Sequence, residues 1–423
     1  MPDGASAGRH SAQHQGAGVK AAVGGVPRAT PGAGLIPPYA VIACSLVFFW
    51  SISVRAVIYT VMPTIAGDLL LSSAVAGLVI SGMLLGYCAG SGPAGWLPIS
   101  RKNRILVGLS LSLLGAALFS MARDFPVLLV AGFLVGTGVG IYLPLGLALL
   151  VEVGGTTRRA HYMAIHEVAA TLGSFSGSAA VALLLPWTDW HGSLLLWCGV
   201  GLLALLAFVL VQDEGGGVPH RGVASQLPLD GTLVYSVLSY GIGTILVMGL
   251  ISMLPLILVR AWGLDQAQAA AVVGNTRLAG LVGVAMAGLI ADRWGHARVL
   301  FVLQVLCLVG GAAMSLDGYG PLFQGGMMVL AVGASGNITL VPVVITAAYP
   351  PAQRERAMAV TSGVGGLLGL VVTPALFGVL LDQGMGSGPI VAATLSAVAM
   401  ILATNRIAAH PSEARGIGDG ATG

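Results

Sequence analysis

The chain has 423 residues, of which 56% are hydrophobic and only 8% are charged, and its formal net charge is +3. Its mean hydropathy of +0.91 excludes a water-soluble domain, because too few polar side chains are present to cover a folded surface. The composition instead predicts an all-α integral membrane protein whose solvent is the lipid bilayer.

Residues 1–35 are rich in Gly, Ala, Ser and Pro and contain no continuous apolar segment. We expect them to form a disordered cytoplasmic tail. Beyond this tail, apolar segments recur that reach the roughly 20 residues needed to cross about 30 Å of hydrocarbon. Twelve such transmembrane helices are expected, at 37–62, 72–97, 104–122, 126–151, 161–185, 191–212, 231–259, 268–291, 298–316, 321–348, 356–381 and 388–405.

The longest polar interruption follows the sixth segment and divides the twelve into two sets of six. This arrangement predicts two pseudo-symmetric six-helix bundles, residues 36–212 and 231–406. A cytoplasmic linker is expected at 213–230 and a cytoplasmic C-terminal tail at 407–423.

Lys and Arg are unevenly distributed between the two sides of this topology. With both termini in the cytoplasm, the external loops hold only Arg123 and Arg260. Short loops that carry positive charge stay cytoplasmic during insertion, so this distribution predicts a multi-pass protein of the cell (inner or plasma) membrane. Fifteen of the nineteen basic residues are then cytoplasmic: Arg9, Lys20, Arg28, Arg101, Lys102, Arg104, Arg158, Arg159, Arg221, Arg293, Arg298, Arg354, Arg356, Arg406 and Arg415.

The loop after the eighth segment has the pattern G-x-x-x-D-R-x-G-x-x-R, formed by Gly288, Asp292, Arg293, Gly295 and Arg298. This pattern resembles the loop motif of the major facilitator superfamily (MFS), which lies at the cytoplasmic ends of helices two and eight. The resemblance implies the twelve-helix fold of that family and a secondary active transporter that works by alternating access.

An aspartate in this loop can face the positive N-terminal end of a neighbouring helix. We therefore expect Asp292 to hold a cytoplasmic gate closed in one state, with Arg158 or Arg159 as its partner. The alternative is an ordinary charged turn.

The first half of the chain departs from the family pattern. The loop that corresponds to the motif keeps Arg101, Lys102 and Arg104 but contains no acid, and Ser178 stands where drug/proton antiporters usually place a proline. In the fourth segment, Gly132 stands where an arginine is expected. These departures weigh against a typical proton-driven drug exporter. The glycines of this segment, at 132, 136, 138 and 140, are expected to allow close helix packing.

Ionisable residues within the bilayer cost at least ~2.5 kcal/mol each, so each needs a partner or a task. Arg55 lies in the first segment, with Ser51 and Tyr59 one turn away on either side along the same face. We expect this polar stripe to line a cavity. Residues 50–72 also resemble the first helix of the cyanate and nitroimidazole branch of the MFS.

Arg277 lies in the eighth segment, about 22 Å along the helix from Asp292, and Arg55 lies about 25 Å beyond Pro38. The two guanidinium groups could therefore share one depth. Two cations at one level of a cavity repel each other, and a bound anion would relieve this while accepting bidentate hydrogen bonds. The alternative is that one arginine reaches the interface or pairs with a carboxylate.

Glu167 lies about eight residues inside the fifth segment, where a carboxyl group removed from water can take up a proton at neutral pH. We expect it to be the coupling proton carrier, with His166 as the second candidate. A salt bridge from Glu167 to a loop arginine is the alternative. Tyr142 and Asn337 are expected to add polar groups to the cavity, as are Tyr235, Tyr240 and Thr361.

The sequence contains no phosphate-binding loop, metal-ligand cluster or nucleophile elbow, so we expect a protein that is not an enzyme and uses no cofactor, metal or nucleic acid. We also expect it to be a monomer. The leading hypothesis is transport of a small organic or inorganic anion, coupled to protons. The alternatives are proton-driven efflux of drugs or toxic metabolites, and a membrane scaffold or receptor that does not transport.

Overall fold

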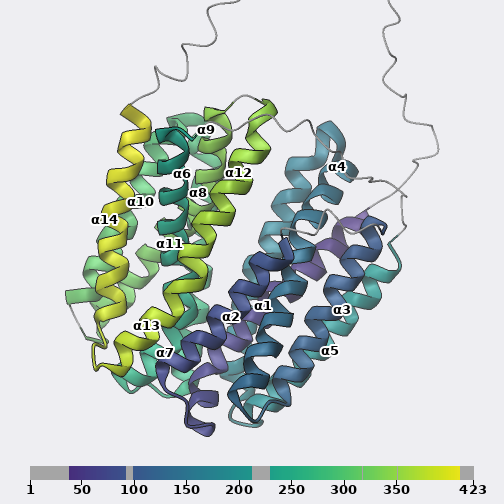
Figure 1. Cartoon of the computed structure of the whole chain (residues 1–423), viewed down its shortest axis with the longest axis vertical. Helices are drawn as coiled ribbons and strands as arrows, with labels where there is room; N and C mark the ends of the chain where they lie inside the picture. The colour runs from purple at the N-terminus through teal and green to yellow at the C-terminus, as the bar shows by residue number, and fades with distance from the viewer. Residues whose placement is uncertain (1–37, 92–98, 212–228, 317, 350, 410–423) are drawn as a thin grey trace, which may run out of the picture. The chain divides into compact units, whose positions relative to one another are not determined.

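The computed structural model describes residues 38–91, 99–211, 229–316, 318–349 and 351–409, and within these ranges it is helical, with turns and short connections but no β-strand (Figure 1). The all-α prediction is therefore confirmed. The expected N-terminal tail lies outside the described residues, as do most of the expected linker and C-terminal tail.

The elements follow the chain in two halves. The N-terminal half contains α1 (Pro38–Asp68), α2 (Ser73–Ser91), α3 (Arg101–Ser120), α4 (Phe125–Leu184) and α5 (Trp190–Val209). The C-terminal half contains α6 (Gly231–Thr244), η2 (Ile245–Leu250), α7 (Ile251–Trp262), α8 (Gln266–Leu289), α9 (Ala291–Trp294), α10 (His296–Leu316), α11 (Pro321–Ala348), α12 (Pro351–Gly366), η3 (Leu367–Val372), α13 (Thr373–Asp382) and α14 (Gly388–Ala409).

Ten helical segments among the described residues are long and apolar enough to cross a membrane, and they coincide with ten of the twelve expected spans. The tenth expected span coincides with α11 and the twelfth with α14. Large apolar side chains lie exposed on the outer faces of these helices, for example Leu203 and Leu402. Such surfaces are stable against lipid rather than water.

The secondary structure of α4 runs without a break through two expected spans, 126–151 and 161–185. A straight helix would separate Tyr142 from His166 by about 36 Å, at about 1.5 Å per residue over 24 residues. In the structure the Tyr142 hydroxyl lies 2.9 Å from Nε2 of His166. The chain therefore turns back within α4, and two separate spans, Phe125–Leu150 and Ile165–Leu184, lie side by side.

Two spans of the C-terminal half are interrupted by π-helical turns. The turn η2 joins α6 to α7, and η3 joins α12 to α13. Pro255 follows η2 and Pro374 follows η3, and each proline lacks the N–H that would bond to the carbonyl four residues earlier. The two irregular turns pack against each other, and Gly249 of η2 lies against the Thr373 side chain beside η3.

Glycines allow the helices of the N-terminal half to approach closely. A Cβ atom at Gly136 would lie 1.8 Å from the Met83 carbonyl oxygen, and one at Gly140 would lie 2.2 Å from the Tyr87 carbonyl oxygen. Because α2 occupies this space, only glycine fits at these two positions of α4. The prediction that these glycines serve helix packing is confirmed.

Aspartates begin many of the helices. The carboxylates of four of them accept a hydrogen bond from a backbone N–H in the first turn of the helix that follows, and so satisfy groups that have no partner within the helix. These capping aspartates are Asp124 before α4, Asp189 before α5, Asp230 before α6 and Asp265 before α8.

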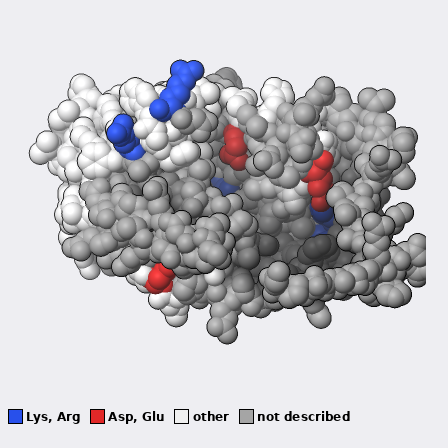
Figure 2. Space-filling view, turned by 90° about the horizontal axis from the view of Figure 1, so that it is seen from above, with Lys and Arg blue, Asp and Glu red and all other residues white. Residues whose placement is uncertain are grey.

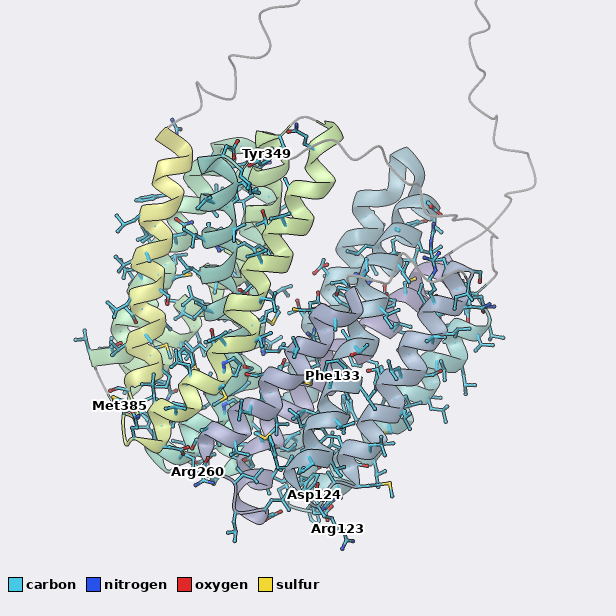
Figure 3. All side chains as sticks on the ribbon, viewed as in Figure 1. Arg123, Asp124, Phe133, Arg260, Tyr349 and Met385 are labelled. Carbon is cyan, nitrogen blue, oxygen red and sulfur yellow. The ribbon has the colours of Figure 1, made fainter. Side chains whose placement is uncertain are left out.

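The two halves contact each other mainly through α2 with α13, α4 with α8, and α1 with α7. Among the described residues, the hydrogen bonds that join the halves lie at one end of the helices. There Asp382 binds the start of α2, Arg260 donates to the Leu71 carbonyl, and Gln266 donates to the Thr60 carbonyl. We call this end of the helices the Arg260 end. Figure 3 shows Tyr349 at the opposite end, which we call the Tyr349 end.

Candidate functional site

Arg55 lies in the middle of α1 and is buried, with 7% of its surface exposed. The carbon of its guanidinium group lies 5.5 Å from the centre of the Tyr87 ring of α2, a cation–π distance. Its Nε atom is shielded from solvent and has no hydrogen-bond partner. Packing against Tyr87 therefore holds this arginine inside the span while part of its donor capacity stays unused.

Arg277 lies in α8 of the other half of the chain, and its Nε atom is also buried without a partner. It interacts electrostatically with Arg55 and with the Tyr59 hydroxyl, and that hydroxyl also interacts with Arg55. The structure therefore brings together Arg55, Tyr59 and Arg277, which come from α1 and α8.

The carboxylates whose side chains are described are nearly all held elsewhere. The four capping aspartates and Asp382 bind helix N-termini, Asp68 accepts from the Trp190 indole, and Glu152 forms a bidentate pair with Arg101. No hydrogen bond or ion pair joins Arg55 or Arg277 to any of the described acids. The pair of cations thus lacks a carboxylate counter-ion among the described side chains.

Other polar side chains expected in the cavity have varied surroundings. The Ser51 hydroxyl and the Tyr59 hydroxyl are buried without a hydrogen-bond partner on the same face of α1 as Arg55. Asn337 accepts a hydrogen bond from Gln304 of α10 at 3.4 Å, and its Nδ2 atom is buried without a partner. The contacts of Asn337 are therefore within the C-terminal half.

A second polar cluster lies where the two spans of α4 meet α1. His166 is fully buried, and its imidazole stacks on Phe48 with ring centroids 4.0 Å apart. Its Nε2 atom lies 2.9 Å from the Tyr142 hydroxyl, which donates to the Cys44 carbonyl at 2.7 Å. The expected cavity residue Tyr142 is itself fully buried, and its hydroxyl is bonded to two groups of the protein.

Glu167 follows His166 and is half-exposed, with 51% of its side-chain surface accessible. One carboxylate oxygen lies 3.9 Å from Nδ1 of His166. The carboxylate also interacts electrostatically with Tyr87, the residue whose ring packs against the Arg55 guanidinium group. Tyr87 thus lies between the two clusters.

The loop motif lies at the Tyr349 end (Figures 1 and 3). Gly288 and the side chains of Asp292, Arg158 and Arg159 lie outside the described residues. Arg293 and Arg298 are exposed. Gly295 separates α9 from α10 and has φ +88, a conformation that side chains with a Cβ atom rarely adopt. The second glycine of the motif is therefore required by the turn itself.

Figure 2 looks onto the upper end of Figure 1 and shows a few charged side chains among the residues that can be described there. Arg101 and Glu152 form a bidentate ion pair in the N-terminal half, with nitrogen–oxygen distances of 2.5 and 2.8 Å. Glu152 comes from α4, so the acid that the first-half loop lacks in sequence is supplied by another helix. In the described part of the chain, no group of three His, Cys, Asp or Glu side chains could hold a metal ion.

Sequence reasoning missed Tyr87, Phe48 and Asp382 as candidate functional residues. Tyr87 and Phe48 are aromatic residues in apolar spans, and their neighbours Arg55 and His166 come from other helices. The only signal for Asp382 was its position at the end of a span. Their contacts with functional residues or with the opposite half appear only when the helices are packed.

The model of the Major Facilitator Superfamily matches residues 43–229 and 232–420. A gallate transporter of Pseudomonas putida is 27% identical over 391 residues, covering 82% of this chain and 86% of the relative. A 3-(3-hydroxy-phenyl)propionate transporter of Escherichia coli (strain K12) is 28% identical over 334 residues, covering 75% of this chain and 80% of the relative.

Among solved structures, a bacterial homologue of the human lysosomal transporter Spinster superimposes with a TM-score of 0.76 at 16% identity, covering 88% of this chain and 97% of that chain. At this identity the likeness shows the fold alone. These comparisons do not support the likeness of residues 50–72 to the cyanate and nitroimidazole branch. The family match covers most of the chain in two consecutive parts, and we conclude that this protein is a membrane transporter, not an enzyme, and belongs to the major facilitator superfamily.

Proposed function

We propose that this transporter carries a small aromatic carboxylate across the membrane by alternating access, and that the carboxylate binds between Arg55 and Arg277. The observation that supports this most directly is a pair of arginines, one from each half of the chain, whose Nε atoms are buried without a partner. The two positive charges repel each other, and no acidic partner lies near them among the described residues. A carboxylate would neutralise both cations and accept bidentate hydrogen bonds from their planar guanidinium groups.

The comparisons support the substrate class. The two relatives above are named for gallate and for 3-(3-hydroxy-phenyl)propionate, which are both aromatic carboxylates. A ligand held by α1 and α8 would contact both halves of the chain. Its binding energy could then be used to move one half relative to the other, since a ligand shifts a conformational equilibrium only by its differential contacts.

Glu167 and His166 carry the coupling proton, Ser51, Tyr59 and Asn337 contribute polar groups to the substrate path, and the loop motif from Gly288 to Arg298 acts as a gate at the Tyr349 end. The protein is a monomer in the cell membrane with both termini in the cytoplasm, and the chain divides into bundles at 36–212 and 231–406.

The test is uptake of radiolabelled gallate and 3-(3-hydroxyphenyl)propionate by proteoliposomes that contain the purified protein. Arg55→Gln and Arg277→Gln are each expected to reduce uptake at low substrate concentration by at least about tenfold, since each removes a charged hydrogen-bonding group worth about 1.5–3 kcal/mol.

The matched control is Arg123→Gln, because Arg123 is exposed in a connection between helices and should not affect uptake. Parental uptake by Arg55→Gln would contradict the assigned site. If instead the parent protein moves apolar cationic drugs and neither carboxylate, the efflux hypothesis replaces this one.

A further inference from the structure

The polar cluster around His166 defines where a proton can bind. The Cys44 carbonyl can only accept, so the Tyr142 hydroxyl must donate its single proton to it across 2.7 Å. Toward His166, 2.9 Å away, the same hydroxyl can then only accept. Nε2 of His166 must therefore carry a hydrogen.

This assignment determines the tautomer of the neutral imidazole. When Nε2 carries the hydrogen, Nδ1 is a bare acceptor. Nδ1 is buried and has no hydrogen-bond partner, and the stacked Phe48 ring covers one face of the imidazole. A buried acceptor without a hydrogen-bond partner is unfavourable.

The carboxylate of Glu167 stands 3.9 Å from this nitrogen, within ion-pair distance. A proton on Nδ1 would turn an unpaired acceptor beside a negative charge into an imidazolium paired with a carboxylate. The other titratable groups around the cluster are Tyr142 on α4 and Cys44 on α1, and Tyr87 on α2 interacts with Glu167. Arg55 interacts with Tyr87 in turn and is the nearby described cation on that side.

We propose that His166 and Glu167 together hold one exchangeable proton, carried on Nδ1 of His166, and that Tyr142 is the positioning residue that fixes the tautomer. Half-exposed Glu167 is the group through which the proton enters and leaves. The sequence pointed to Glu167 as the main carrier, whereas the hydrogen-bond geometry assigns the resting place of the proton to its buried neighbour.

The position of the proton also determines the sign of coupling, and this part rests on the proposed anion site. Without the proton, the pair carries one negative charge beside Tyr87, whose ring contacts Arg55. Uptake of the proton brings the pair to zero net charge, which makes the surroundings of Arg55 and Arg277 more favourable for an anion. By reciprocity, a bound anion strengthens proton binding by the same factor. Proton and carboxylate therefore bind together, as in a symporter.

The proton site is tested without substrate, by nitrogen-15 NMR of histidine-labelled protein in lipid nanodiscs between pH 5 and pH 9. The His166→Gln spectrum identifies the His166 signals. We expect a protonated Nε2 and a bare Nδ1 at high pH, with Nδ1 gaining a proton on acidification, and a mixture of tautomers in Tyr142→Phe. A protonated Nδ1 with a bare Nε2 at high pH, or no change across this range, would overturn the site.

The coupling is tested by calorimetric titration of gallate from pH 6 to pH 8. Linkage to one proton predicts that the dissociation constant rises by up to about tenfold per pH unit. His166→Gln should remove this dependence, while His161→Gln, which changes an exposed histidine on the same helix, should keep it. A parent affinity that does not change with pH would overturn the coupling. If gallate does not bind at any pH, the anion site fails, and the NMR result alone decides the proton site.

Discussion

The carboxylate of Asp382, the last residue of α13, accepts a hydrogen bond at 2.8 Å from the backbone N–H of Ser73, the first residue of α2 and 309 positions earlier in the chain. Its second oxygen accepts from the N–H of Ala74, also at 2.8 Å. One acid thus caps a helix of the opposite half, where it meets unpaired N–H groups and the positive end of the helix dipole. This contact stabilises closure of the Arg260 end.

Asp382→Ala should shift the protein toward states in which the Arg260 end is open. Loss of a helix cap costs about 1 kcal/mol, which corresponds to a roughly fivefold change in the ratio of the two states. Spin labels at Leu70 and Met385, both exposed at this end, would report the change as a longer distance distribution by pulsed electron resonance. The control is Asp189→Ala, which removes a cap within one half. Equal shifts in the two variants would contradict a role between the halves.

Gly77→Ala should separate α2 from α13. A Cβ atom at residue 77 would lie 2.3 Å from the Pro374 carbonyl oxygen, and because that oxygen is backbone, a helix has to move. Overpacking of this kind costs about 1–3 kcal/mol, so the thermal unfolding midpoint in detergent should fall. Gly67→Ala in α1 has open space around it and should leave the midpoint unchanged or higher. A midpoint for Gly77→Ala equal to that of Gly67→Ala would show that the two helices do not pack this closely.

Gly295→Ala should destabilise the turn between α9 and α10. At φ +88 a Cβ atom is strained by about 1–2 kcal/mol even though open space surrounds this residue. The expected result is a lower unfolding midpoint and slower transport. Gly325→Ala also has open space around it but lies in α11 without a positive φ, so its midpoint should not fall. Equal midpoints for the two variants would mean that the backbone at Gly295 is not strained.

Arg55→Lys should weaken gallate binding by about tenfold or more although the positive charge is kept. Lysine cannot present the planar fork that binds a carboxylate bidentately and stacks on Tyr87. Calorimetric titration measures the affinity, and Arg123→Lys is the control on an exposed site. Parental affinity in Arg55→Lys would reduce the role of Arg55 to its charge alone.

The pair formed by Arg101 and Glu152 should contribute only modestly to stability. Glu152 is about half-exposed, at 52% of its side-chain surface, so solvent screens the interaction. A double-mutant cycle of Arg101→Gln and Glu152→Gln should give a coupling of about 0.5 kcal/mol in the free energy of unfolding, and less at 1 M salt. A coupling that does not change with salt would indicate a buried pair instead.

The sequence by itself determined the all-α membrane fold, the position of most spans and the family. These follow from local properties: a span needs about 20 apolar residues, and the loop motif is contiguous. The role of Gly136 and Gly140 in packing was also predictable, because glycines four residues apart on a helix leave one face flat enough for a neighbour.

Only the tertiary structure decided which side chains meet. Arg55 and Arg277 are 222 positions apart, and their proximity depends on the packing of α1 and α8. The same holds for Asp382 of α13, which caps the start of α2, and for Glu152 as the partner of Arg101. It also holds for the Tyr142 hydroxyl, which binds His166 only because α4 turns back on itself. In a membrane protein nearly every helix is apolar, so hydropathy locates the spans but carries no information on which faces pack together. The role of each of the few polar side chains therefore depends on its neighbours in the folded structure.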